Sequence, residues 1–366
     1  MPNLRLRALQ EAGVSIWLDD LSRQRIRSGG LNRLIADDSV TGVTTNPTIF
    51  ASAFRDLDAY GQDLAAHRGT PTDDAVRSLM VADVTQACDA LAPVHEASAG
   101  RDGYVSIEVD PRLAYDTQAT IDQAARLHGM VNRPNALIKI PATTAGLPAV
   151  RDSIAAGVSV NVTLIFSIQR YRQVLDAYLD GLTAAAGAGL DVSRIHSVAS
   201  FFVSRVDTEV DERLAAIGTP QAQAMLGRAA VANARLAYGA YRELFAGPRF
   251  AALAAEGAHP QHPLWASTGT KNPSYSDIKY VEELIAPDCI ITMPEKTLRA
   301  FGDHGEVPGD TITAHITEAA QVMSDLAGLG IDLDDVFDVL ERQGVDKFIA
   351  SWQELLDSVA PALSLN

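Results

Sequence analysis

The sequence predicts an α/β fold, a closed (β/α)8 TIM barrel, and two observations carry this prediction. Eight short runs of apolar and β-branched residues alternate with helix-like stretches along the 366-residue chain. Several runs are apolar at nearly every position, as in parallel strands that helices cover. A doubly wound open sheet is the alternative, but no strand precedes a Gly-x-Gly-x-x-Gly turn. We expect residues 1–366 to form a single barrel domain with additional helices, including C-terminal helices after strand eight.

The expected strands follow one another in order. They are SIWLD, which ends at Asp19, and the runs at 42–47, 104–110, 136–141, 159–166, 195–202, 264–269 and 289–294. Apolar spacing of three and four predicts helices at 115–131 and 167–185. Further helices are expected at 48–66, 72–91, 219–246 and 310–360, and the proline-rich stretch 258–263 is expected to be a loop.

Composition excludes several classes of function. Lys plus Arg is 30 and Asp plus Glu is 46, a net charge of −16, so nucleic acid and anionic membranes are not expected partners. No run approaches the roughly 18 apolar residues of a membrane helix, and no signal-peptide stretch is present. The two cysteines, Cys88 and Cys289, have no metal-site spacing. We expect a cytoplasmic protein.

Polar residues gather where the predicted strands end. In a parallel barrel, the carboxyl ends of the strands build the active site. The residues at or near these ends are Asp19, Thr44, Asn46, Glu108, Lys139, Asn161, Thr163, Ser200 and Ser267. The sequence therefore predicts one polar site at this end of the barrel.

Lys139 is the most informative of these residues. It is one of five lysines and the only one before Lys271. Most of the positively charged residues of the chain are arginines. It points opposite to Ile138 and Ile140, whose bulk suits the helix layer, so we expect Lys139 in the lumen. A lysine on a strand can instead snorkel to the surface or pair with Glu108. In a site with carboxylates, its neutral amine can attack a carbonyl and form a Schiff base.

Schiff-base chemistry also needs proton transfer and substrate binding. Asp19 and Glu108 are candidate general base and acid, although either could be a strand-end cap or a salt-bridge partner. The amides and hydroxyls suit sugar hydroxyls, although singly such residues more often cap structure. Arg205, near the start of a helix, and Lys271, after the seventh strand, could hold a phosphate or be ordinary surface charges.

The combination of motifs resembles the transaldolase family, in its bacterial long-chain branch, over nearly the whole chain. The matching stretches are WLDDLSR (17–23), GVTTNPTIF (42–50), VSIEVDPRLAYD (105–116), LIKIPAT (137–143), VNVTLIFS (160–167), SFFVSR (200–205), LWASTGTKNPSYSD (264–277) and ITMPEKTL (291–298). The resemblance implies reversible transfer of a dihydroxyacetone unit from sedoheptulose 7-phosphate to glyceraldehyde 3-phosphate, giving erythrose 4-phosphate and fructose 6-phosphate. It implies phosphorylated sugar substrates and neither a metal nor an organic cofactor.

The resemblance also implies roles for residues. Lys139 matches the Schiff-base lysine, Asp19 the aspartate that acts on the C4 hydroxyl, and Glu108 with Thr163 the pair that positions a catalytic water. The matching binding residues are Thr44, Asn46 and Asn161 for the dihydroxyacetone part, Ser200 for substrate and Arg205 for phosphate. Phe202 stands where transaldolases have phenylalanine and related fructose 6-phosphate aldolases have tyrosine, which favours transfer.

One motif departs from the family pattern. Other branches carry Ser-x-Arg near the seventh strand, whereas Ser267 here is followed by Lys271 and no arginine. Lysine is a point charge rather than a planar fork, so the second phosphate contact is left open.

Three alternative functions differ in the residues that they require. A fructose 6-phosphate aldolase-like enzyme would use the same lysine. A metal-dependent barrel hydrolase would need His-x-His in its first strand, and a binding module without activity would have no use for Lys139 and both carboxylates. The sequence leaves a monomer or a homodimer open.

Overall fold

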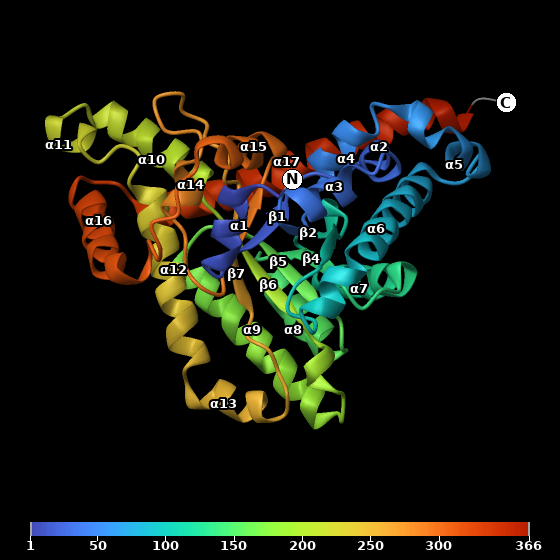
Figure 1. Cartoon of the computed structure of the whole chain (residues 1–366), viewed down its shortest axis with the longest axis horizontal. Helices are drawn as coiled ribbons and strands as arrows, with labels where there is room; N and C mark the ends of the chain where they lie inside the picture. Colours follow the sequence, from blue (N-terminus) through green and yellow to red (C-terminus); the bar gives the residue numbers. More distant parts are fainter. Residues whose placement is uncertain (1, 365–366) are drawn as a thin grey trace.

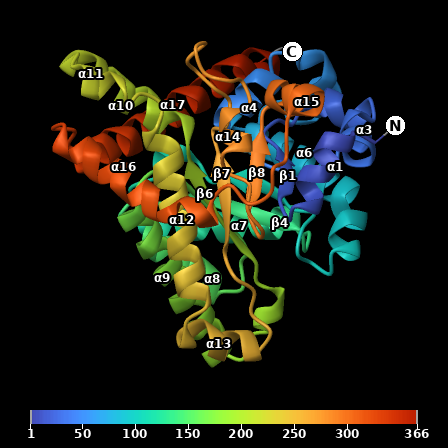
Figure 2. The ribbon, with the colours of Figure 1, turned by 60° about the vertical axis from the view of Figure 1, so that its left-hand side comes forward.

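Eight parallel strands close into a barrel in the order β1 to β8 in the computed structural model, which describes residues 2–364. The strands are β1 (Ser15–Leu18), β2 (Val40–Val43), β3 (Val105–Glu108), β4 (Ala136–Pro141), β5 (Val160–Ile165), β6 (Ser197–Phe202), β7 (His262–Ala266) and β8 (Ile290–Met293). Closure comes from β1, which pairs with both β2 and β8, and Figure 2 shows β7, β8 and β1 side by side. The predicted barrel is confirmed, and the open sheet is wrong.

Helices surround the strands (Figure 1). They are α1 (Leu4–Glu11), α2 (Arg23–Arg27), α3 (Gly30–Asp37), α4 (Pro47–Ala53), α5 (Gly61–Ala66), α6 (Thr72–Ala97), α7 (Thr117–Val131), α8 (Gly146–Ala155), α9 (Ile168–Gly187), α10 (Ser204–Ile217), α11 (Pro220–Gln223), α12 (Ala229–Phe245), α13 (Pro248–Ala255), α14 (Lys279–Glu282), α15 (Glu295–His304), α16 (Ile316–Gly328) and α17 (Leu333–Ser364). Short 3-10 turns lie at Leu57–Tyr60, Pro111–Leu113, Val192–Arg194 and Thr313–His315. Within residues 2–364, no helix combines the length and the apolar character needed to cross a membrane.

Three predicted elements differ from the structure. The expected helix at 219–246 is two helices, α11 and α12, because Gly227 between them has a positive φ of 71° that a helix cannot contain. The helix expected at 48–66 is α4, a 3-10 turn and α5. The expected loop at 258–263 overlaps β7, which begins at His262 because that residue pairs with Val198 of β6.

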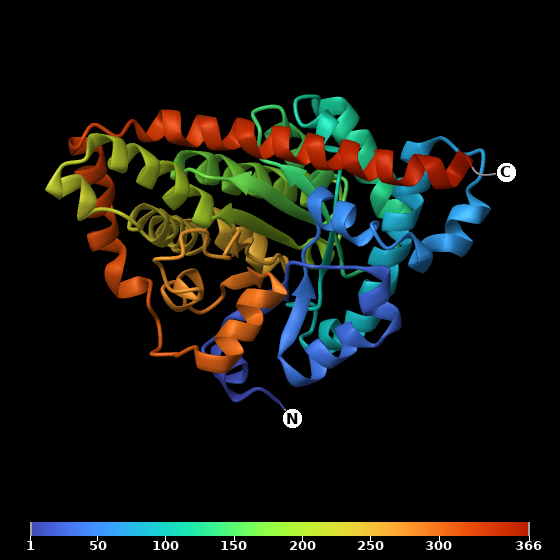
Figure 3. The same cartoon turned by 90° about the horizontal axis from the view of Figure 1, so that it is seen from above.

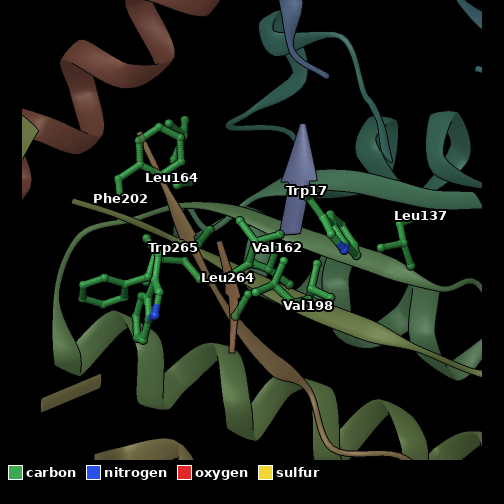
Figure 4. Packing of buried hydrophobic residues seen from close by; sticks show 14 of the residues in the cluster. Trp17, Leu137, Val162, Leu164, Val198, Phe202, Leu264 and Trp265 are labelled. Atoms are coloured by element: carbon green, nitrogen blue, oxygen red, sulfur yellow. The ribbon is translucent and has the colours of Figure 1, made fainter. Parts of the chain in front are cut away.

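A tryptophan fills the barrel below its carboxyl end. Trp17 is fully buried, and its Nε1 donates a 2.8 Å hydrogen bond to Asp102 Oδ1. The ring lies on Gly42, where a Cβ atom would come within 2.4 Å of the ring carbon Cε2. Figure 4 shows Trp17 among the packed core side chains, with Leu137, Val198 and Leu264. The interior below the site is therefore a packed core.

The 32-residue helix α17 lies across the carboxyl end of the barrel, and Figure 3 shows it running along one side of the molecule from above. Its Ser351 Oγ lies 2.8 Å from Thr48 Oγ1 of α4, and Glu341 pairs with Arg170 of α9 at 3.3 Å. Gly344 allows the close approach, because a Cβ there would lie 2.9 Å from Leu164 Cδ2 of β5. The last helix thus packs directly on the barrel mouth.

Candidate active site

A pocket of about 190 Å³ opens at the carboxyl end of the barrel. Nine of the twelve predicted site residues line it: Asp19, Thr44, Asn46, Lys139, Ser200, Phe202, Arg205, Ser267 and Lys271. The other three, Glu108, Asn161 and Thr163, are buried in the strands that support the pocket. The structure therefore brings all twelve to one end of the barrel.

Lys139 and Glu108 form a buried pair. The register of β3 and β4 sets them side by side, and Lys139 Nζ lies 3.5 Å from Glu108 Oε2. The two side chains are only 4% and 2% exposed, and Nζ also donates a 3.0 Å hydrogen bond to Thr45 O. Burial raises the pKa of Glu108 to about 7, although the positive charge of Lys139 opposes this shift. Glu108 can therefore hold or release a proton near neutral pH.

Asp19 is the second carboxylate of the pocket, directly after β1. Its Oδ1 accepts a 2.7 Å hydrogen bond from Thr44 Oγ1, which also lies 2.6 Å from Thr292 Oγ1. Burial raises the pKa of Asp19, and the charge of Lys139 opposes the rise. The neighbouring Asp20 instead forms an ion pair with Arg25 of α2. Of the two adjacent aspartates, Asp19 is the one beside the lysine.

A chain of hydrogen bonds supports the floor of the pocket. Ser200 Oγ donates to Asn161 Oδ1 at 2.7 Å, and Asn161 Nδ2 donates to Ser106 Oγ at 2.9 Å. Two buried oxygens nearby are short of hydrogen bonds: Thr163 Oγ1 has no partner among residues 2–364, and Glu108 Oε2 has only its 3.5 Å ion pair with Lys139 Nζ. Buried polar atoms almost always bind a partner, so these two oxygens suit a water or a substrate hydroxyl.

Asn46 and Ser267 line the pocket and also make hydrogen bonds within the protein. Asn46 caps α4, since its Oδ1 accepts a 3.0 Å hydrogen bond from Ile49 N. Ser267 follows β7 with a positive φ of 57°, and its Oγ lies 3.0 Å from Ser204 Oγ. The positive φ is a strained conformation for serine, of the kind that clusters at functional sites.

Positive charges line the mouth of the pocket. Arg205, in the first turn of α10, is half-buried, and its Cζ lies 5.4 Å from the centroid of the Phe202 ring. Lys271 is exposed in the loop after β7. Sequence reasoning missed a third lining cation, Lys347, and its neighbour Phe348, both on α17. The scarcity of lysine that singled out Lys139 was a signal for Lys347 too.

Two further threonines line the pocket, Thr292 from the predicted eighth strand and Thr48, and the sequence assigned neither of them a role. Thr292 of β8 bonds Thr44, and Thr48 of α4 bonds Ser351 on α17. Single threonines at strand and helix ends are common, so their sequence positions carried no specific signal.

A closed parallel barrel with a buried amine, two carboxylates and a cationic mouth is the arrangement of an enzyme that can form a Schiff base with an anionic carbonyl compound. The family model described as Transaldolase/Fructose-6-phosphate aldolase matches residues 16–359, and the chain belongs to this family. The predicted family membership is thereby confirmed.

Curated relatives match along the full chain. A transaldolase of Mycolicibacterium smegmatis is 59% identical over 359 residues, which cover 97% of this chain and 96% of the relative. Transaldolase 1 of Streptomyces avermitilis is 57% identical, with 98% and 95% covered, and a transaldolase of Saccharopolyspora erythraea is 58% identical, with 99% and 98% covered. These relatives are enzymes of the transferase class.

Proposed function

We propose that this protein catalyses the transaldolase reaction of the non-oxidative pentose phosphate pathway. A dihydroxyacetone unit passes reversibly from sedoheptulose 7-phosphate to glyceraldehyde 3-phosphate, giving erythrose 4-phosphate and fructose 6-phosphate. The observation that carries the proposal is the buried Lys139–Glu108 pair beneath a pocket that Asp19 lines. The transaldolase names of the full-length relatives support it.

The first step joins the donor to Lys139. The neutral amine attacks the C2 carbonyl and forms a carbinolamine, which loses its hydroxyl as water to leave a Schiff base. Glu108, whose pKa is about 7, donates the proton that the leaving hydroxyl needs. Thr163 Oγ1 holds the water beside it, which the unpartnered state of this buried hydroxyl supports.

The second step breaks the C3–C4 bond. Asp19 takes the proton of the C4 hydroxyl, the C4 carbon becomes the aldehyde of erythrose 4-phosphate, and the bonding electron pair moves into the protonated imine. An enamine remains on Lys139. The raised pKa of Asp19 makes it a stronger base than an exposed aspartate.

The third step transfers the unit. The C3 carbon of the enamine attacks the aldehyde of glyceraldehyde 3-phosphate, and Asp19 returns its proton to the new hydroxyl. Water then hydrolyses the Schiff base and releases fructose 6-phosphate. Every proton moves between these side chains, substrate and water, so we propose that neither a metal nor an organic cofactor takes part.

The polar and the cationic residues of the pocket are assigned to different parts of the substrate. We assign Thr44, Asn46, Asn161 and Ser200 to the dihydroxyacetone hydroxyls, because they lie around Lys139. Ser267 and the cations Arg205 and Lys271 bind the phosphate end.

Simple cleavage, as in a fructose 6-phosphate aldolase, is the second candidate. Phe202 favours transfer, because its buried ring lies between Phe166 and Arg205 and offers no hydroxyl to the pocket. An assay with fructose 6-phosphate alone separates the two. Steady release of dihydroxyacetone without an acceptor aldehyde would favour cleavage.

The Schiff base is tested by trapping. The protein is incubated with fructose 6-phosphate, reduced with borohydride and mapped by mass spectrometry. We expect a three-carbon adduct on Lys139. An adduct on Lys271 or another lysine, or no adduct, would overturn the mechanism.

We further propose that residues 1–366 act as one domain, as a monomer or homodimer, in the cytoplasm. Cys88 and Cys289 are both buried and unpaired, which supports a reducing compartment. Size-exclusion chromatography with light scattering tests the oligomeric state.

A further inference from the structure

Three cations from separate parts of the chain meet at the mouth of the pocket: Arg205 from α10, Lys271 from the loop after β7, and Lys347 from α17. We propose that Lys347 completes the subsite that holds the phosphate of the sugar substrate, so that the last helix is part of the substrate-binding site. The inference rests on the proposed function and assigns a residue to its phosphate contact.

The geometry of α17 directs Lys347 to this place. A Cβ on Gly344 would lie 3.7 Å from Arg205 Nη1, so the helix passes directly beside the guanidinium. Lys347 is three residues further and lies on the same side of the helix as Gly344. Phe348 follows, with its ring centroid 5.9 Å from Lys139 Nζ. One turn of α17 therefore reaches from Arg205 to Lys139.

None of the three charges is held in an ion pair in the described part of the chain, although the carboxylate of Asp19 acts on Arg205 and Lys271. No ion pair within 4.0 Å joins Arg205, Lys271 or Lys347 to an acidic side chain among residues 2–364. Partial burial lowers the pKa of Lys347, and the charges of Arg205 and Lys271 lower it further. In a chain of net charge −16, this cluster is unusual. A bound phosphate would relieve the repulsion by accepting charge-assisted hydrogen bonds from all three.

The helix holds Lys347 in a defined position. Glu341 pairs with Arg170 before it, and Ser351 bonds Thr48 after it, so α17 is attached to the barrel on both sides. The neighbouring groove is lined by Asp20, Asp56 and Glu295 and, among the described residues, by no lysine or arginine, so it offers a phosphate no cation. Arg25 is already paired with Asp20 and Glu295. The phosphate group of a substrate is therefore expected at the cationic mouth of the pocket, beside Lys347, and not in the acidic groove.

The test compares Lys347→Gln with Lys296→Gln, an exposed lysine on α15 that does not line the pocket. Transfer to erythrose 4-phosphate, which gives sedoheptulose 7-phosphate, is measured with fructose 6-phosphate and with unphosphorylated D-fructose as donors. For Lys347→Gln we expect the ratio of kcat/KM for the two donors to fall by about 10- to 100-fold, as for loss of a hydrogen bond between charged groups. Lys347→Arg should recover most of the ratio, and Lys296→Gln should match the wild type.

A second readout does not depend on turnover. Inorganic phosphate should raise the melting temperature of the wild type and of Lys296→Gln, and should raise that of Lys347→Gln much less. The inference is overturned if Lys347→Gln keeps the donor ratio and the phosphate response of Lys296→Gln, or if both donors lose activity equally. Absence of transfer or of a Lys139 adduct in the wild type would instead refute the proposed function. The effect of inorganic phosphate on the melting temperature would still test whether Lys347 belongs to a phosphate site.

Discussion

Lys139 Nζ and Glu108 Oε2 face each other at 3.5 Å across the neighbouring strands β4 and β3, both almost completely buried. In the proposed mechanism, the pair joins the nucleophile Lys139 to Glu108, a group whose pKa of about 7 lets it exchange protons near neutral pH. An isolated buried charge would be very unfavourable, so each member stabilises the charged form of the other. The pair also makes the stability of the fold depend on pH.

Glu108→Gln should change that dependence. The pKa of Glu108 is raised from 4.5 to about 7 in the folded state, so between these values the folded protein binds more protons than the unfolded chain. This group therefore stabilises the wild type below pH 4.5, and the stabilisation, roughly 3 kcal/mol, is lost as pH rises through 7. The free energy of unfolding in urea should therefore fall between pH 5 and pH 8 in the wild type, and Glu108→Gln should not show this fall. The exposed Glu354→Gln should behave as the wild type, and an equal loss in Glu108→Gln would contradict the assignment.

Asp19→Asn should separate Schiff-base formation from cleavage. The amide cannot accept the C4 hydroxyl proton, so turnover should fall by about 10²–10⁴-fold while Lys139 still reacts. Borohydride trapping with fructose 6-phosphate should then give an intact six-carbon adduct instead of a three-carbon adduct. Asp20→Asn, which removes the ion pair with Arg25, is the control and should still give the three-carbon adduct. A three-carbon adduct in Asp19→Asn would rule out Asp19 as the base.

Thr163→Val should lower activity without lowering stability. Thr163 Oγ1 is buried without a hydrogen-bond partner in the described structure, so its removal costs no folded-state bond. We expect kcat to fall by about 10²-fold, with a melting temperature equal to or above that of the wild type. Thr268→Val is the matched comparison: its Oγ1 donates to Thr292 O at 2.7 Å, so its loss should cost about 1–3 kcal/mol. A destabilised Thr163→Val would indicate a structural role instead.

Gly344→Ala should loosen α17 from the barrel mouth. The new Cβ would meet Leu164 Cδ2 at 2.9 Å, and the displacement should cost about 1–3 kcal/mol and raise KM for fructose 6-phosphate. Gly129→Ala, at an exposed position in the last turn of α7 with open space around it, should instead stabilise by about 0.5–1 kcal/mol. Chemical unfolding and steady-state kinetics of both variants check this. Unchanged stability and KM in Gly344→Ala would show that α17 can shift freely.

The strands of the barrel could be predicted because parallel strands are apolar at almost every position. All eight were found: β4 has the predicted bounds, β6 ends where predicted, and the other six end one to four residues early, since polar residues such as Asp19 and Thr44 lie just beyond the ladders. The region at 219–246 was predicted less well, because its helical composition continues through the turn between α11 and α12, where Gly227 has a positive φ. The candidate site followed from the same logic, since polar residues at successive strand ends must meet in a closed barrel.

The barrel and the set of strand-end residues around Lys139 follow from the amino-acid sequence alone, because a period of two assigns each strand residue to the lumen or to the helix layer. The position of α17 across the mouth, which brings Lys347 and Phe348 to the pocket, depends on how the whole chain packs. Helical spacing shows that α17 has an apolar face but does not show which surface covers it. The close approach of Gly344 to Leu164, residues far apart in the chain, determines that contact.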